Sequence, residues 1–575
     1  MNALKYILVV FFLSAHFAAF SQDESGLKEL SRAKDFKLQE RVLLIFDQDF
    51  YLAGETLNFF AVTLDAALQI PITFSSILYI ELYNQDNKVL TTKKVLLKNG
   101  EATNTLALPR EINTGYYYIR AYTNFMKNFG PSTFFIKRLK IVNPFVPNAV
   151  SLIDTLSDNN NIAAKAAQDP EQLFGYNKPR AGLVINAHLN KTEANRGDTI
   201  TLDIDSSNTD SIQYVLALHL GNKLTLPSLQ ENIASTLKSL SYSHLTYLPE
   251  FTTDIVTGRV NAGNSNVSTA NKILYLSFVD SVSWTTRCRT DTLGRFTATL
   301  PIEYQGDDLV VSMVDTTNSF SIVFDDEFSP YFLEVNKEDY SPNPSLKPII
   351  EARMLNLQVN DAYDEPTESS ISAERPLLRF YGYPDNEYII NTYTDLPNLE
   401  EFIREVVLEA YVRKRRAQTS IMVKTEKTNN KSPLIILDGI PLFQADHLLP
   451  LISTEKLKSV RVVASRFFFG SEIYEGILDI TSNDKALSLV EKDKNSVRIR
   501  FSPVTTTPAN NKLMNLRTPH YTSDLYFDSI NSAKGKESIR IALPQNAGLY
   551  SLTLFGYTKN GEWDYRVLPD ILNVK

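Results

Sequence analysis

The sequence predicts a mainly β protein, in which several β-sandwiches follow one another in series and one small α+β domain is added. The chain has 575 residues, which is enough for several separate cores. It contains 28 Tyr and 32 Phe but only 21 Gly, a balance that favours strands with aromatic cross-strand pairs. Short apolar runs also recur between turn residues at the regular spacing of a sandwich.

Charge and composition narrow the classes of function. Charged residues make up 22% of the chain and hydrophobic residues 43%, which is typical of a folded globular protein. There are 58 basic and 66 acidic residues, so the net charge is −8. No basic excess is available to neutralise phosphates, and we therefore expect no nucleic-acid partner.

The first 21 residues have the layout of a secretory signal peptide. Lys5 supplies a positive charge, an apolar run of about 15 residues follows, and Ala19 and Ser21 are small residues suited to cleavage. An N-terminal membrane anchor is the alternative, but this run is short for a span of about 20 residues. We expect cleavage between Ser21 and Gln22 and an exported protein that is periplasmic, surface-associated or secreted.

The single cysteine, Cys288, lies far from the apolar run, so the sequence predicts neither a lipid anchor there nor an internal disulfide. The run WTTRCRT around Cys288 is strand-like, and we expect the thiol to be a small side chain within a sheet. No apolar run of 18 residues follows Ser21, so we expect no membrane-spanning segment after signal cleavage.

Residues 36–146 predict the first sandwich. From Arg41 the run RVLLIFDQDFYLAGETLNFFAVTLDA forms a strand, a turn and a strand. Its segment DQDFYLAGETLNFFAV, with Tyr51, Gly54 and Glu55, resembles the signature of the macroglobulin-like β-sandwich domain of bacterial α-macroglobulins. Gly54 suits a turn position with positive φ, so we interpret it as a structural residue.

The resemblance implies the fold of this domain and not the chemistry of whole α-macroglobulins. Those proteins trap proteases through a thioester motif in which a Cys is followed by Gly, Glu and Gln. Cys288 lies between two arginines in RCR, so the sequence lacks that motif. About 110 residues carry the resemblance, which also fits exported envelope proteins of Gram-negative bacteria.

Residues 147–180 are polar and irregular, and they predict a linker. Residues 181–252 predict a second sandwich that again resembles a macroglobulin-like domain. Within it, the run LPSLQENIASTLKSLSYS predicts a helical insertion because its apolar residues recur at near-helical spacing.

Residues 253–345 predict a third sandwich. The turn that starts at Asp291 and contains Gly294 and Phe296 is similar to that of small carboxypeptidase-regulatory-like domains, which are non-catalytic spacers. We expect Gly294 to serve a hairpin and Phe296 to fill the core. Residues 346–376 predict an amphipathic helix followed by a second linker.

Residues 377–490 predict the small α+β domain. A helix is expected to start near Pro397, and the apolar strand in SPLIILDGIPLFQ ends in a turn. The order of the segments resembles the plug domain of TonB-dependent outer-membrane receptors. In that family an apolar strand ends in the motif Asp-Gly-x-Pro. A later segment then contains an aromatic residue followed by Gly, a short loop, and Gly-Ile at the start of a strand. The matching residues are Asp438, Gly439, Ile440, Pro441, Phe469, Gly470, Gly476, Ile477 and Ile480.

The chain departs from that family after the plug-like domain. Only 91 residues follow Asp484, too few for the many strands of a membrane barrel. Residues 491–575 instead predict a C-terminal sandwich. The sequence therefore predicts a plug-like module without a pore.

Catalytic motifs are missing from the sequence. The five histidines after the signal peptide show no zinc-ligand spacing, and no Gly-x-Ser-x-Gly or phosphate-binding loop occurs. Asp446 beside His447 is interpreted as part of a solvated loop. We expect a protein that is not an enzyme, with no metal and no cofactor. The basic run Arg413 to Arg416 is interpreted as a solvated helix end.

Two functions are compatible with these patterns. The first is a non-enzymatic exported scaffold that docks onto an outer-membrane transporter or assembly complex, or another periplasmic partner, through its plug-like domain. The alternative is a soluble macroglobulin-type protein that binds ligands or proteases through its N-terminal sandwiches. For the first function, the candidate interface residues are Asp438, Gly439, Pro441, Phe467, Phe468, Phe469, Gly470 and Gly476. The aromatic triple is an interface if it is exposed, and core if alternate rings are buried.

Overall fold

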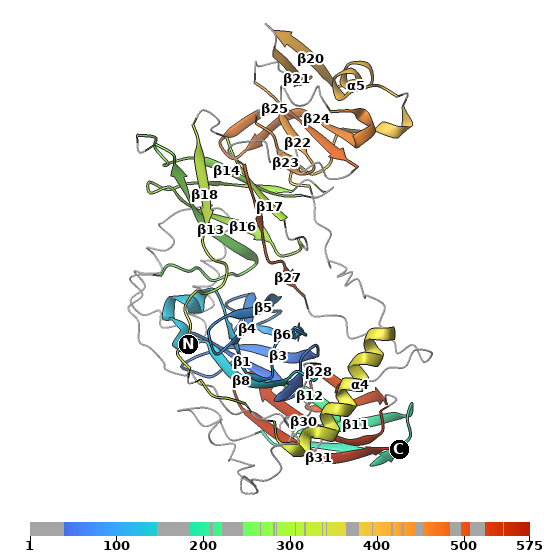
Figure 1. Ribbon diagram of the computed structural model, residues 1–575. Helices are drawn as coiled ribbons and strands as arrows, with labels where there is room; N and C mark the ends of the chain where they lie inside the picture. Colours follow the sequence, from blue (N-terminus) through green and yellow to red (C-terminus); the bar gives the residue numbers. More distant parts are fainter. Residues whose placement is uncertain are drawn as a thin grey trace. The chain divides into compact units, whose positions relative to one another are not determined.

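The computed structural model describes residues 39–145, 183–206, 211–220, 245–363, 379–443, 452–483, 496–506, 524–543 and 546–575, with short gaps inside the longer ranges. The predicted signal peptide at 1–21, the predicted linkers at 147–180 and 364–376 and the predicted helical insertion of the second sandwich lie outside the described residues. The described chain is mainly β, as predicted (Figure 1). No helix in these ranges is long and apolar enough to cross a membrane.

The chain divides into two compact units, and both are discontinuous in sequence. The described part of unit 1 comes from Thr252–Glu327 and Ala373–Pro503, and that of unit 2 from the segments up to Phe251, from Phe328–Ser372 and from Val504–Lys575. Domain boundaries therefore cannot be drawn as consecutive intervals of the sequence.

Unit 2 contains the first sandwich, formed mainly by residues 40–142. One sheet has three strands, β1 (Glu40–Phe46), β3 (Thr56–Asp65) and β6 (Glu101–Ala107). The other has six, in the order β2 (Phe50–Leu52), β8 (Phe135–Val142), β7 (Gly115–Tyr122), β4 (Ile77–Asn84), β5 (Val89–Leu96) and β27 (Val504–Thr505). Two short 3-10 helices, Phe125–Phe129 and Pro131–Thr133, connect β7 to β8. β27 comes from the C-terminal region and pairs in parallel with β5.

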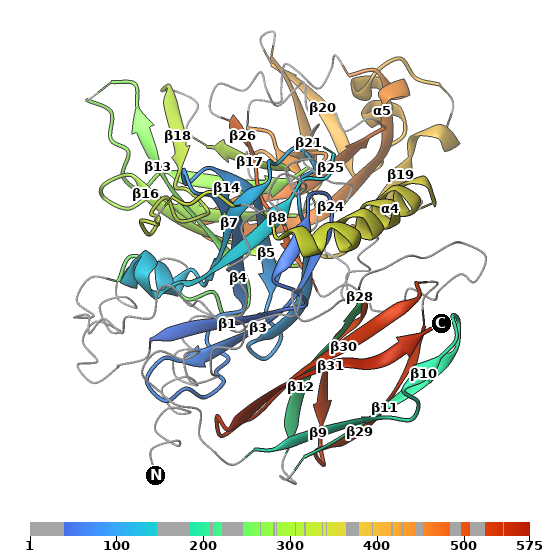
Figure 2. The same ribbon diagram turned by 60° about the horizontal axis from the view of Figure 1, so that its bottom comes forward.

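Unit 2 also contains a second sandwich, which joins residues 185–220 to the C-terminal region. Its smaller sheet has β29 (Lys536–Ala542), β11 (Thr199–Ser206) and β9 (Ile185–Leu189). Its larger sheet has β10 (Glu193–Ala194), β31 (Trp563–Val574), β30 (Gly548–Thr558), β12 (Ile212–Leu220) and β28 (Asp524–Ser532). Figure 2 shows the smaller sheet lying against the larger one.

This arrangement corrects the prediction of two separate sandwiches at 181–252 and 491–575. The central strand β12 pairs with β28 on one side and β30 on the other, and both come from the C-terminal region. Buried residues from both regions, including Ile200, Tyr214, Tyr550 and Leu572, form one apolar cluster. Neither region has enough strands of its own to cover both faces of a core, so the two regions complete each other.

The main helix of unit 2, α4 (Lys347–Tyr363), lies where the sequence predicted an amphipathic helix. A 3-10 turn, Pro344–Leu346, precedes it, and the Asn343 side chain caps that turn by accepting from Ser345 N. Leu346 and Ile350 pack against Phe50, Leu52 and Val142 of the first sandwich. The helix is therefore an integral part of unit 2.

Unit 1 contains a sandwich formed by residues 253–324 and one later strand. Its sheets are β16 (Arg295–Pro301), β13 (Thr253–Ala262) and β18 (Phe320–Phe324), and β15 (Thr285–Arg289), β14 (Ile273–Phe278), β17 (Asp308–Met313) and β26 (Ser496–Arg500). Cys288 lies on β15 in the apolar core, where burial raises the pKa of its thiol to about 12. A thiol of this kind is protonated at neutral pH and is a poor nucleophile.

The rest of unit 1 is a small module, residues 379–483, that corresponds to the predicted plug-like domain. Its sheet has the order β19 (Asn386–Ile389), β24 (Leu457–Phe469), β25 (Glu472–Ser482), β22 (Leu434–Leu437) and β23 (Ile440–Pro441). The sheet is accompanied by a hairpin of β20 (Ala410–Arg415) and β21 (Gln418–Val423), the helix α5 (Leu399–Glu405) and the 3-10 turns Ile390–Thr392 and Thr454–Lys456.

The structure corrects the predicted end of the helix in this module. Asn398 caps α5 by accepting from Glu401 N at 3.0 Å, and the helix ends at Glu405, ten residues before Arg415. Arg413 and Lys414 lie on the strand β20, so the basic run is not at a helix end. The β-branched residues that follow the helix favour extended backbone.

Candidate functional site

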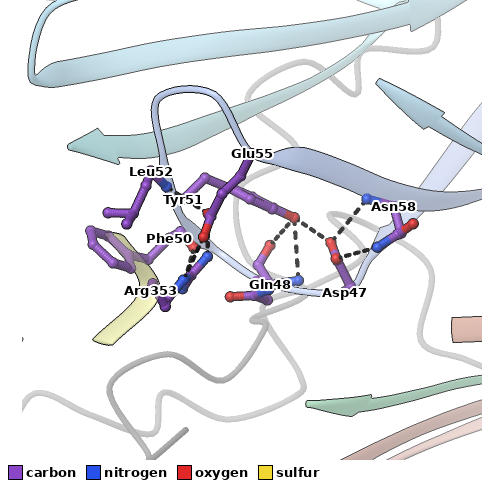
Figure 3. Close-up of polar contacts among 8 residues, drawn as sticks. All are labelled: Asp47, Gln48, Phe50, Tyr51, Leu52, Glu55, Asn58 and Arg353. Carbon is purple, nitrogen blue, oxygen red and sulfur yellow. Dashed lines mark hydrogen bonds and ion pairs between the residues drawn. The ribbon is translucent and has the colours of Figure 1, made fainter. Parts of the chain in front are cut away.

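The turn of residues 47–55, which carries Tyr51, Gly54 and Glu55, is a closed polar network (Figure 3). The Tyr51 hydroxyl donates to Asp47 Oδ1 at 2.5 Å and to the Gln48 carbonyl at 2.9 Å. Asp47 also accepts from the Asn58 side-chain amide at 2.8 Å. Tyr51 is fully buried, so its hydrogen bonds hold the turn from the inside and its ring presents no surface to a partner.

Glu55 closes the other end of the turn. Its carboxylate accepts from Leu52 N at 2.7 Å and from Arg353 Nε at 2.8 Å, and Arg353 Nη2 makes a second contact with it. Arg353 belongs to α4 and also donates to the Phe50 carbonyl at 3.3 Å. Gly54 has φ +89°, in the region that favours glycine. The turn is therefore the socket into which α4 inserts a buried arginine.

Arg353 was missed by the sequence analysis. It lies 298 residues from Glu55, and an arginine in an amphipathic helix is usually a solvated residue. One signal could have indicated that Arg353 is buried: in the run SLKPIIEARMLN it lies three residues after Ile350, and therefore on the same side of α4.

A second buried arginine holds the segment that precedes α4. We call residues 328–340 the strap; its described residues form no helix or strand and cross the first sandwich. Arg120, on β7, donates to the carbonyls of Ser329 at 2.6 Å and Tyr331 at 2.5 Å. Its guanidinium also pairs with Glu81 at 2.6 Å and lies 3.8 Å from the centroid of the Phe332 ring.

Aromatic rings fix the rest of the strap. Phe328 packs edge-on against Tyr79, with ring centroids 5.5 Å apart, and Tyr340 lies 5.0 Å from Tyr116. Main-chain carbonyls of the strap are thus satisfied by side chains of the sandwich, which is how an irregular segment avoids unpaired backbone groups. This face of the first sandwich is occupied by the chain itself.

The Asp-Gly turn of the module of residues 379–483 is also structural. Asp438 has φ +49° and is buried, and its carboxylate accepts from Ser482 N at 2.7 Å and Ser482 Oγ at 2.6 Å. Gly439 and Pro441 are buried beside it. Gly476 has φ +89°, and a Cβ there would lie 2.6 Å from Val423. These four residues offer no side-chain surface for docking, contrary to the prediction.

The aromatic triple divides in the way that alternation along a strand requires. Phe467 and Phe469 pack against Phe380, with ring centroids 5.7 and 5.2 Å away. Phe468 points the other way, and its side chain is 64% exposed. The triple is therefore not one contiguous exposed surface, and only Phe468 is available to a partner.

The hairpin tip that follows the triple is held by the sandwich of unit 1. Arg287, on β15, donates to the Phe469 carbonyl and to Ser471 Oγ, both at 2.8 Å. A Cβ on Gly470 would lie 1.7 Å from Arg287 Nη1, so only glycine fits without rearrangement. Tyr275 and Tyr474 share a hydrogen bond of 2.8 Å between their hydroxyls. Part of the surface predicted to bind a partner is thus an internal interface of unit 1.

Gly294 and Phe296 belong to the hairpin between β15 and β16. The Asp291 carboxylate accepts from Leu293 N and Arg295 N, both at 2.8 Å, and Gly294 has φ +77°. Phe296 is buried and lies 5.6 Å from the Phe324 ring. Both residues shape the sandwich and line no site.

The exposed apolar side chains of the module lie elsewhere. Tyr383, in the turn before β19, is 90% exposed, and Leu408, between α5 and β20, is 74% exposed. Ile389 and Tyr393 are exposed at the end of β19, which is an edge strand. Large apolar side chains at a sheet edge are typical of surfaces that bind other proteins.

In the part of the chain that the structure describes, no group of three or more His, Cys, Asp or Glu side chains could hold a metal ion. Asp446 and His447 lie outside the described residues.

No family model matches the sequence, and no curated protein matches it. Among solved structures, the chain is similar to Escherichia coli alpha-2-macroglobulin activated by porcine elastase, with 10% identity, a TM-score of 0.22, and coverage of 93% of this chain and 44% of that one. For Salmonella alpha-2-macroglobulin reacted with methylamine, the identity is 8%, the TM-score 0.22, and the coverage 94% and 40%.

A third similar structure is dimeric latent PorU from Porphyromonas gingivalis, with 10% identity, a TM-score of 0.16, and coverage of 49% of this chain and 33% of that one. The chain spans less than half the length of each of these proteins. These TM-scores carry no argument about family. The sandwich fold rests on the chain's own sheets and cores, and the macroglobulin and plug resemblances stay predictions.

Proposed function

We propose that this chain is an exported, non-enzymatic scaffold that binds a protein of the cell envelope, an outer-membrane transporter or assembly complex, through the module of residues 379–483. The observation that carries the proposal is the set of exposed apolar side chains on this module. Tyr383 and Leu408 are the most exposed large apolar residues among the described ones, and Phe468 follows within the module. Leaving such side chains in water is unfavourable, so their burial by a partner supplies binding free energy.

The structure changes where on the module the partner is expected. Asp438, Pro441, Phe467 and Phe469 are used inside unit 1, so we place the interface on Tyr383, Leu408, Phe468 and the edge strand β19. An aromatic anchor beside a short strand edge suits a partner that adds its own strand or loop.

The test is affinity purification of the tagged mature protein from detergent-solubilised envelopes of its host, with partners identified by mass spectrometry. We expect stoichiometric recovery of an outer-membrane protein by the wild type and its loss in the double variant Tyr383→Ser, Leu408→Ser. The matched control is Leu293→Ser, Val323→Ser, which removes two exposed apolar side chains from the sandwich of the same unit.

The alternative, a macroglobulin-type protein that binds ligands or proteases, places the interface on the first sandwich. Leu68 and Phe145 are exposed there, so Leu68→Ser, Phe145→Ser is its matching variant. Loss of partner only in this variant would favour the alternative. Recovery of the protein alone, from the soluble fraction, would contradict docking to the outer membrane. Deleting the first sandwich is not a clean test, because α4 and the second sandwich pack on it.

A further inference from the structure

His219 is a buried histidine that the proposed function does not use. It lies at the end of β12 and is completely inaccessible to solvent. Neither of its ring nitrogens has a hydrogen-bond partner in the described structure, and the same holds for the buried Thr553 hydroxyl on β30. Unpaired buried polar atoms are rare in folded proteins and are costly, so their presence here calls for a reason.

These groups share one face of the larger sheet in the second sandwich. His219 pairs with Ser551 and Ala217 with Thr553, and residues paired across antiparallel strands point to the same side. Leu216 and Leu218 point to the opposite side, into the core of that sandwich. Val215, on the same side as His219, packs against Phe60 and Val62 of the first sandwich. The face with His219 is therefore the one that joins the two sandwiches of unit 2.

Other polar groups at this joint are paired. Tyr557 donates to Glu101 Oε1 at 2.5 Å, and Thr103 and Ser529 share a hydrogen bond of 2.8 Å. His219 and Thr553 differ from these pairs, because their buried polar atoms have no hydrogen-bond partner among the residues that the structure describes.

Two charged groups act on His219 from neighbouring elements. Burial, together with the guanidinium of Arg353 on α4, lowers the pKa of its imidazole to about 4, and Asp49 in the turn before β2 opposes the shift. Asp49 is already paired with Lys137 at 2.5 Å, and Arg353 is held by Glu55. On β28, Asp524 is the backbone partner of His219. A proton on His219 would add a second cation that interacts with Arg353, and Asp49, the carboxylate that acts on His219, is already paired with Lys137.

We propose that His219, Thr553 and the Arg353–Glu55 clamp form an acid-sensitive joint between the two sandwiches of unit 2, which opens when His219 gains a proton. Opening hydrates the imidazolium and the Thr553 hydroxyl together and loosens α4 from its socket. The second sandwich keeps its own core, because the apolar cluster inside it contains no histidine. The joint thus converts external acidity into separation of two domains.

The test uses the whole mature chain and amide hydrogen exchange read by mass spectrometry at about pH 7.5 and about pH 4.5, with rates corrected for intrinsic exchange. In the wild type, we expect peptides of α4, β12 and β30 to exchange roughly 50- to 100-fold faster at the lower pH, the factor that follows from the shifted titration of one histidine. In His219→Gln this acceleration should be lost. His188→Gln, which changes an exposed histidine on β9, is the matched control and should behave as the wild type.

A second measurement does not depend on the variant folding. Exchange of the imidazole C2 hydrogen in the unmodified protein reports the titration and accessibility of each histidine separately. We expect the C2 hydrogen of His219 to exchange slowly and its imidazole to titrate near pH 4, because burial lowers its pKa. Titration of His219 at the ordinary pKa of a histidine, about 6.5, or an unchanged acid response in a folded His219→Gln, would overturn the proposal.

Discussion

The turn of the first sandwich and the Asp-Gly turn of the module of residues 379–483 both contain a glycine with positive φ, but they have different roles. In the first, Glu55 binds Arg353, a residue 298 positions away on another element. In the second, Asp438 binds Ser482, which lies 44 positions away in the same small sheet. Both turns use a glycine with positive φ and a buried carboxylate. A turn motif in the sequence therefore predicts the local backbone geometry. The residue that binds the carboxylate of the turn decides whether the turn stabilises a single sheet or joins two separate elements.

The largest expected effect tests the long-range socket. Arg353→Met should destabilise unit 2 by about 3 to 5 kcal/mol, because it leaves the buried Glu55 carboxylate without its cation. Chemical denaturation monitored by tryptophan fluorescence measures the change. Arg110→Met is the matched control, since the Arg110–Asp361 pair joins the same helix to the same sandwich but has side chains that are 50% and 43% exposed. It should cost less than about 1 kcal/mol. If the two substitutions lowered the stability by the same amount, the buried Arg353–Glu55 pair would contribute no more than an ordinary surface ion pair.

The next effect tests the internal docking of the module. Phe469→Ser should destabilise unit 1 by about 2 to 3 kcal/mol, because it removes a ring from an aromatic cluster and leaves a cavity there. It should also weaken the packing of the strand segment whose carbonyl accepts from Arg287. Phe468→Ser should change the stability by less than about 0.5 kcal/mol, since that ring is exposed. Thermal unfolding of the two variants under identical conditions gives the comparison. A larger loss in Phe468→Ser would reverse the assignment of the two faces of β24.

A pH experiment extends the comparison to a buried carboxyl without a cation. Glu40 accepts from Ser75 N at 2.9 Å, Ser75 Oγ at 2.7 Å and Thr123 Oγ1 at 2.5 Å, and burial raises its pKa to about 7. A raised carboxyl pKa stabilises the folded state fully below pH 4.5 and progressively less as the pH rises through 7. Glu40→Gln should therefore gain about 2 kcal/mol relative to the wild type between about pH 5 and pH 8, measured by urea unfolding.

The His219 contribution has the opposite sign. Its lowered pKa gives stability that is present above pH 6.5 and is lost as the pH falls toward 4. The two groups nearly offset each other in the wild type, so Glu40→Gln should expose a loss of stability on acidification. A Glu40→Gln profile parallel to the wild type would show that Glu40 is not the titrating group.

The smallest effect concerns the local turn. Asp438→Asn should cost about 1 kcal/mol, because asparagine tolerates the positive φ and retains one acceptor oxygen but loses the charge-assisted hydrogen bond to Ser482. Local hydrogen exchange at the end of β25 measures the loss. If Asp438→Asn destabilised the protein as much as Arg353→Met does, the two turns would contribute equally to stability and the comparison would fail.

Several features could be predicted because their causes are local. Alternating apolar residues and frequent turns indicated strands, and the helical spacing after Leu346 indicated α4. The positive φ of Gly54 and the turn positions of Gly294 and Gly439 followed from turn chemistry. The end of α5 was predicted less well, because helix and strand propensities compete in EVVLEAYVRKRR and burial of Phe402 and Ile403 decides the outcome.

The candidate interface depended on contacts that a sequence does not contain. Alternation alone could say that Phe468 faces away from Phe467 and Phe469, but not which side meets the sandwich of unit 1. That was decided by Arg287 and Tyr275, which lie nearly 200 residues earlier. Arg120, Arg353 and His219 were not identified for the same reason, since each acquires its role from partners on distant segments.

The sequence by itself determined the mainly β class, the positions of most strands and turns, the helix α4 and the absence of the thioester motif, because periodicity, turn residues and short motifs act over a few positions. Only the tertiary structure decided that β12 pairs with β28 and β30, that β26 and β27 complete sheets in different units, and that α4 inserts Arg353 beside Glu55. Backbone hydrogen bonds are the same for every strand, so pairing is selected by which apolar faces can be buried together, and that selection involves the whole chain at once.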